Sequence, residues 1–124
     1  MSAAPLYVDT SALLKWYLQE PFSEEFSAFI QQHPGARISS LTVTEMHCTL
    51  SRLTRNREIS APYRAEALST FSAQMAAGYL NLMPVEDNYF AHATELIDSL
   101  KLPLRTLDGL HLSVAHAARS KALA

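Results

Sequence analysis

Three acidic residues of this 124-residue chain, Asp9, Glu45 and Asp108, are the best candidates for chemistry. Asp9 directly follows the apolar run of residues 6–8, which is typical of a short strand, and small hydroxyl residues then open a helical pattern. Ligands of open α/β sheets bind outside the carboxyl ends of the strands, so an Asp in this place points to a site. Glu45 and Asp108 each fall in the first turn of a predicted helix. Their separations of 36 and 63 residues leave room for the crossovers that return each element to one sheet edge.

Carboxylates that meet at one sheet edge repel one another, which raises their pKa values unless a cation neutralises them. Ligand sets made only of oxygen suit Mg²⁺ or Mn²⁺ rather than zinc. One or two such ions activate water and stabilise an in-line phosphoryl transition state. The three residues therefore predict a Mg²⁺ or Mn²⁺ site that acts on a phosphate ester.

Each carboxylate also has a purely structural interpretation. The first can belong to a strand-to-helix turn in which Thr10 or Ser11 is the N-cap. Thr42-x-x-Glu45 matches a capping box, in which the glutamate reaches back to the threonine N–H. Asp108 in a first helical turn is stabilised by the helix dipole. An aspartate-nucleophile phosphatase is not favoured, because it would carry a second Asp where this chain has Ser11.

The rest of the pattern predicts one α/β domain over residues 1–124, with a parallel β-sheet flanked by helices. Ser60 is a predicted N-cap with Pro62 early in the helix that it starts, and Gly78 is predicted to end that helix. We expect strands over 6–8, 37–41 and 79–85, and helices over 12–18, 22–33, 42–55, 62–77, 86–100 and 106–119. Phe90 and Ala93 are expected on the apolar stripe of the helix over 86–100.

Three segments together resemble the acidic motifs of PIN domains: YVDTSAL at 7–13, SLTVTE at 40–45 and LRTLDGLHL at 104–112. They occur in the right order over nearly the whole chain. Within that family, the sequence is most similar to VapC-type toxins of bacterial type II toxin–antitoxin systems.

The resemblance implies a three-layer α/β/α fold and a Mg²⁺- or Mn²⁺-dependent endoribonuclease. Asp9, Glu45 and Asp108 would hold the metal, and Ser11 matches the hydroxyl beside the first Asp. It further implies an RNA substrate, a VapB-like cognate antitoxin that blocks the site, and a homodimer.

The sequence departs from the family in one respect. Such toxins usually continue past the third motif into a strand that carries a fourth Asp and then a closing helix. No acidic residue follows Asp108 in this chain. Either that tail is missing from this polypeptide, or the domain works with three carboxylates. A catalytically incomplete PIN-like module, used as a scaffold that binds an antitoxin or RNA, is the alternative function.

Other residues are weaker candidates. Lys15, Arg52 and Arg55 are possible RNA contacts, although a solvated helix end also explains the two arginines. His111 lies one turn after Asp108 and is a candidate to face the site, but it belongs to no paired ligand motif. Cys48 has no flanking base pattern, so we expect a buried, inert thiol.

The composition limits the surroundings in which the protein works. A net charge of −2 gives no global positive field that would attract nucleic acid, so RNA contact needs a local basic patch or bound cations. The single cysteine excludes an intrachain disulfide and suits a reducing cytoplasm. No apolar run approaches the ~20 residues of a membrane span, and the N-terminus lacks a signal-peptide pattern. We therefore expect a cytoplasmic protein without membrane contact.

Overall fold

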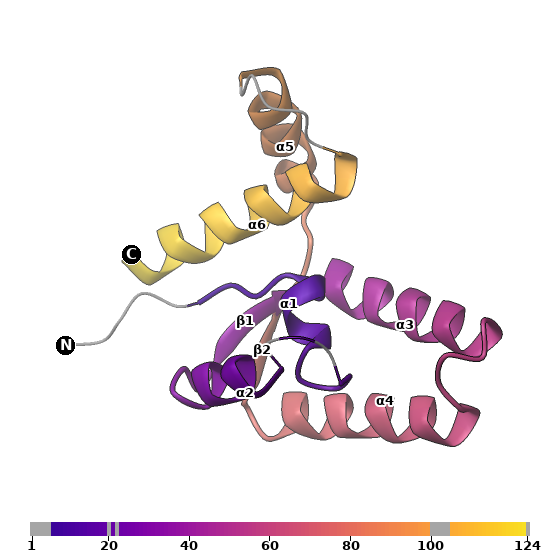
Figure 1. Cartoon of the computed structure of the whole chain (residues 1–124). Helices are drawn as coiled ribbons and strands as arrows, with labels where there is room; N and C mark the ends of the chain where they lie inside the picture. Colours follow the sequence, from indigo (N-terminus) through magenta and orange to yellow (C-terminus); the bar gives the residue numbers. More distant parts are fainter. Residues whose placement is uncertain (1–5, 20, 22, 100–104, 124) are drawn as a thin grey trace.

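The computed structural model describes residues 6–19, 21, 23–99 and 105–123, and the side chains of all of these except 106, 107 and 119–123. Within these residues, helices alternate with two short strands (Figure 1). The elements are α1 (Thr10–Leu14), α2 (Ser23–Gln31), β1 (Ala36–Ser39), α3 (Ser40–Arg55), α4 (Ala61–Ala76), β2 (Leu80–Met83), α5 (Asp87–Ser99) and α6 (Thr106–Leu123).

The two strands form a parallel pair, as predicted, with Ala36 opposite Leu80. The N-terminal segment joins the sheet through a single parallel bridge between Tyr7 and Arg37. Arg37 also pairs with Asn81, so β1 lies between the N-terminal segment and β2. The predicted strand over 6–8 is therefore reduced to one bridge, which nevertheless places Asp9 at the same end of the sheet as the last residue of β1.

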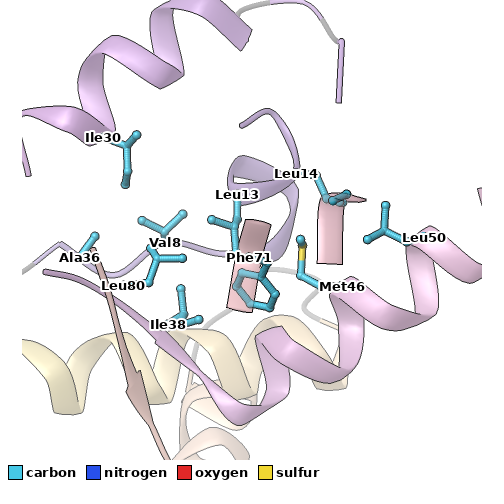
Figure 2. Packing of buried hydrophobic residues seen from close by; sticks show 11 residues of the cluster. Val8, Leu13, Leu14, Ile30, Ala36, Ile38, Met46, Leu50, Phe71 and Leu80 are labelled. Atoms are coloured by element: carbon cyan, nitrogen blue, oxygen red, sulfur yellow. The ribbon is translucent and has the colours of Figure 1, made fainter. Parts of the chain in front are cut away.

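One face of the sheet is covered by α1 to α4, which bury the larger apolar cluster. This cluster combines Met46 and Leu50 from α3, Phe71 from α4 and the strand residues Ile38 and Leu80, all of which are labelled in Figure 2. All five side chains are almost fully buried. The cluster also holds the buried residues Val8, Leu13, Leu14, Ile30, Ala36 and Ala67.

The other face is covered by α5 and α6, which pack side by side (Figure 1). Here Tyr89 of α5 and Val114 of α6 form a smaller cluster with Met83 of β2, and Tyr7 packs against it. Tyr7 and its neighbour Val8 thus lie in different clusters, because successive side chains of an extended segment point to opposite faces. The result is a parallel sheet flanked by helices, as the sequence predicted.

Helix ends follow local capping signals, although α1 and α3 start at Thr10 and Ser40, each two residues earlier than predicted. Asp9 itself caps α1, and Ser39 caps α3 in a capping box with Thr42. Ser60 is the N-cap of α4, as predicted. Gly78 directly follows the C-cap residue of that helix and has a φ of +85°. Residues with a side chain rarely adopt this left-handed backbone conformation, which explains the glycine at this place.

Two predictions about burial were wrong. Cys48 is exposed on α3 rather than buried, since the core-facing positions of that helix are taken by Met46 and Leu50. Phe90 is 50% exposed, because α5 is rotated so that its neighbour Tyr89 enters the core instead. Within the described residues, no helix combines the length and apolarity needed to cross a bilayer.

Candidate active site

Asp9 lies at the junction between the N-terminal segment and α1. Its Oδ1 accepts a hydrogen bond from the Ala12 N–H at 2.9 Å, which makes Asp9 the N-cap of that helix. The interpretation in which Thr10 or Ser11 caps the helix is therefore wrong. The Asp9 side chain is exposed, and within the described residues no hydrogen bond engages its Oδ2. One carboxyl oxygen is thus fixed by the backbone, while the other is available to a ligand.

Asp108 lies in the first turn of α6, with its side chain exposed. It shares a cavity of about 500 Å³ with Asp9, so the structure brings the first and the third predicted site residue together. The cavity lies between the N-terminal segment, α2 and α6. Its lining is apolar on one side, and it comprises Leu6, Tyr7, Val8, Asp9, Ala12, Phe26, Phe29, Asp108, His111, Leu112 and Ala115.

Glu45 lies behind this cavity, in the second turn of α3. Its Oε1 accepts a hydrogen bond from Thr10 Oγ1 at 2.7 Å and contacts His111 Nε2 at 2.5 Å. The capping-box interpretation of Glu45 is wrong, because Thr42 holds that position relative to the true N-cap, Ser39. The Glu45 carboxylate is therefore not used for capping, and its bond to His111 links it to α6, the helix that also carries Asp108.

His111 is bonded through both ring nitrogens. On the side away from Glu45, its Nδ1 lies 2.7 Å from the Tyr7 hydroxyl, which in turn lies 3.1 Å from Ser39 Oγ. Burial raises the pKa of Tyr7; hydrogen bonds from Ser39 and Thr42 oppose that rise, and the negative charges of Glu45 and Asp9 add to it. The Tyr7 hydroxyl thus keeps its proton at neutral pH.

Sequence reasoning missed two members of this network. Tyr7 was treated only as part of a strand, and Thr10 only as a cap. The sole sequence signal for Tyr7 and Thr10 is their closeness to Asp9, which places both near the end of the N-terminal segment.

Comparison with protein family profiles identifies the family of this chain. The PIN domain profile matches residues 6–124, a range that includes all three acidic positions. The chain belongs to the PIN domain family. PIN domains are a nuclease-type fold, and they typically act as nucleases that depend on divalent metal ions. Comparison with curated proteins and with solved structures gave no match.

The donor set of this PIN domain fits a hard cation. Among the side chains that the structure describes, no three His, Cys, Asp or Glu residues are grouped closely enough to hold a metal ion. Two carboxylates suffice for Mg²⁺, which keeps several waters and is commonly bound through one or two carboxylates together with substrate phosphates. Asp9 and Asp108 supply these two oxygen donors on one cavity. Glu45 is held one hydrogen bond behind it, by His111.

The predicted RNA contacts lie in two different places. Lys15 follows α1 and its Nζ donates to the Pro21 carbonyl at 3.4 Å. Arg52 and Arg55 are exposed in the last turn of α3. Helical rise places their backbones about 10 Å and 15 Å beyond Glu45 along the helix axis. The two arginines therefore lie away from the cavity that Asp9 and Asp108 share.

Proposed function

We propose that this PIN domain is a Mg²⁺- or Mn²⁺-dependent endoribonuclease in which Asp9 and Asp108 bind the metal directly and Glu45 contributes to the site through a water ligand of the metal. The observation that carries the proposal is the shared cavity of Asp9 and Asp108, with Glu45 attached to its wall through His111. A divalent ion in this place activates water and neutralises charge during an in-line displacement at phosphorus.

The protein residues contribute binding and orientation. Asp9 and Asp108 face solvent, so without a cation their negative charges repel a phosphodiester. With a cation bound between them, Asp9 and Asp108 would no longer repel the approaching phosphate. The Ala12 N–H fixes Asp9 Oδ1 in one position, which orients the rest of that carboxylate before the substrate arrives.

The substrate side of the proposal is an unpaired RNA strand. Sequence-selective RNA contacts mostly involve single-stranded bases that stack on aromatic side chains. Phe29, at 45% exposure, and the half-buried Phe26 form an aromatic wall of the cavity that holds the two carboxylates. Arg52 and Arg55 are placed to contact backbone phosphates at a distance from the cut.

The biological role that we propose is that of a VapC-type toxin in the cytoplasm. The support is the similarity of its three motifs to those toxins. Phe29 and Leu112 also expose apolar surface at the rim of the cavity, where a covering partner would bury it. A VapB-like antitoxin that binds there blocks the carboxylates, and the active form is a homodimer.

Conservative amide variants test this function directly. Asp9→Asn and Asp108→Asn should abolish Mn²⁺ binding, measured by calorimetry, and metal-dependent cleavage of a single-stranded RNA. Asp87→Asn is the matched control, because Asp87 is an exposed carboxylate in the first turn of α5 and does not line the cavity. Full cleavage by Asp9→Asn in added Mn²⁺ would contradict the assignment of this residue as a metal ligand.

A second function is favoured by one specific observation. Among the described residues, two carboxylates rather than three line the cavity, and Oε1 of the third, Glu45, is bonded to Thr10 and His111. A catalytically incomplete PIN module that binds an antitoxin or RNA as a scaffold would show this arrangement. The wild-type chain would then bind RNA without Mn²⁺ uptake and without cleavage.

A further inference from the structure

We infer that His111 and Thr10 are positioning residues for Glu45, which they hold so that one of its oxygens remains available to a water ligand of the divalent cation. The inference rests on the proposed function, since it assigns a role to the hydrogen-bond network behind the metal site. Neither residue is required to touch the substrate.

The argument begins with the two oxygens of the Glu45 carboxylate. Thr10 Oγ1 and His111 Nε2 both bond to Oε1, at 2.7 Å and 2.5 Å. Within the described residues, Oε2 has no hydrogen-bond partner, although the side chain is only 23% exposed. Two donors that converge on one oxygen fix the plane of the carboxylate and leave the other oxygen for a ligand. Carboxylates that bind metals are commonly held by hydrogen bonds in this way.

The direction of the hydrogen bonds at His111 follows from the Glu45 carboxylate. The Glu45 carboxylate can only accept, so His111 Nε2 carries a proton and donates to it; in the neutral ring Nδ1 then accepts from the Tyr7 hydroxyl, 2.7 Å away. Tyr7 is itself held by Ser39, whose side chain is fully buried at the N-cap of α3. The imidazole is thus held at both ends, which restricts its rotation.

The helices explain why this role falls on His111 in particular. His111 follows Asp108 by three residues on α6, so the two side chains lie on one helix face, and both line the cavity. Thr10 similarly follows Asp9 and lies under it, 7% exposed. Each proposed metal ligand on the cavity therefore shares its element with a residue that anchors Glu45.

Two amide substitutions at His111 test its bonds to Glu45 and to Tyr7 separately. In His111→Gln the side-chain amide extends to the position of Nε2 and can still donate to Glu45. In His111→Asn the shorter amide extends only to the position of Nδ1, so the contact with Tyr7 is kept and that with Glu45 is lost. His47→Asn is the matched control, because His47 is an exposed histidine on α3, away from the cavity.

The measurement is the dissociation constant for MnCl₂ by calorimetry, together with cleavage of a single-stranded RNA at several Mn²⁺ concentrations. We expect His111→Asn to weaken Mn²⁺ binding by about 10- to 100-fold, as is typical when a residue that supports a metal site is lost. Excess Mn²⁺ should recover its cleavage. His111→Gln should rescue most of the affinity, and His47→Asn should match the wild type.

Each other outcome has a defined meaning. If the wild type binds Mn²⁺ and both His111 variants bind it equally well, the positioning role is overturned while the proposed function stands. If both variants lose affinity and melting temperature to the same extent, His111 serves the fold alone and the inference also fails. If the wild type binds no Mn²⁺, the proposed function fails and the inference fails with it.

Discussion

The Thr10 hydroxyl donates a hydrogen bond to Glu45 Oε1 across 2.7 Å and so joins the first turn of α1 to α3. Thr10 is 7% exposed, whereas the neighbouring Ser11 is exposed to solvent. Two adjacent hydroxyl residues of the same motif therefore face different surroundings. Among the contacts of the described residues, only Thr10 of these two is bonded to Glu45.

This difference predicts opposite results for two substitutions. Thr10→Val keeps the shape of the side chain but leaves Glu45 with one donor fewer, so the free energy of unfolding should fall by about 1.5–3 kcal/mol. Mn²⁺ affinity should fall as well. Ser11→Ala should change the free energy of unfolding by no more than about 0.5 kcal/mol. Urea denaturation and calorimetry measure the two quantities, and a larger loss of Mn²⁺ affinity in Ser11→Ala would contradict the prediction.

Asp9 combines a capping role with its proposed role as a ligand, and two variants separate them. Asparagine caps helices about as well as aspartate, so Asp9→Asn should retain nearly the full free energy of unfolding. Asp9→Ala should lose about 1 kcal/mol because the bond to the Ala12 N–H disappears. Both variants remove the same charge, so their difference in urea midpoint isolates the cap. Equal stability of the two variants would show that the cap contributes nothing.

The packing of α6 on α5 depends on Gly109. A Cβ at this position would lie 2.8 Å from Ile97 Cδ1 and 3.0 Å from Ile97 Cγ1. Gly109→Ala should therefore lower the free energy of unfolding, although alanine is favoured by up to about 1 kcal/mol over glycine within a helix. In an Ile97→Val background, which lacks Cδ1, the same change should be less destabilising. A double-mutant cycle by urea denaturation measures this coupling, and additive effects would contradict it.

The pH dependence of stability should be dominated on the alkaline side by buried tyrosines. Burial raises the pKa of Tyr17 far above its ordinary value, so the folded protein holds this proton more tightly than the unfolded chain. Its contribution to stability is complete below the unfolded pKa of about 10 and is lost as the pH rises above that value. Tyr17 should therefore leave the urea midpoint unchanged from pH 8 to about 10, and above that pH it should make the midpoint fall.

Tyr17→Phe tests that assignment. It should reduce the alkaline fall, and it should cost about 1 kcal/mol at neutral pH because the hydroxyl bonds to Gln74. Tyr79→Phe is the control, since Tyr79 is 57% exposed. An unchanged alkaline slope in Tyr17→Phe would assign the fall to other groups, of which Tyr7 is the first candidate because its pKa is also raised.

The sequence by itself determined the order of the elements and, apart from the segment over 6–8, their type, because these depend on local signals. The Ser60 cap with Pro62 in the first turn marks the start of α4, and Gly78 marks its end. Apolar periodicity correctly placed Ala93 of α5 in the core, although it failed for Phe90. The three acidic motifs predicted the PIN domain family, which the profile match confirms. Their roles as metal ligands stay a prediction.

Only the tertiary structure decided how these elements are used. Several adjacent residues can cap α1 and α3, and the choice of Asp9 and Ser39 depends on where the chain leaves the sheet. Glu45 matches a capping box by spacing, yet its carboxylate binds Thr10 and His111, which are remote in sequence. Such contacts form only when the sheet brings α1, α3 and α6 to one edge, and no local pattern encodes that convergence.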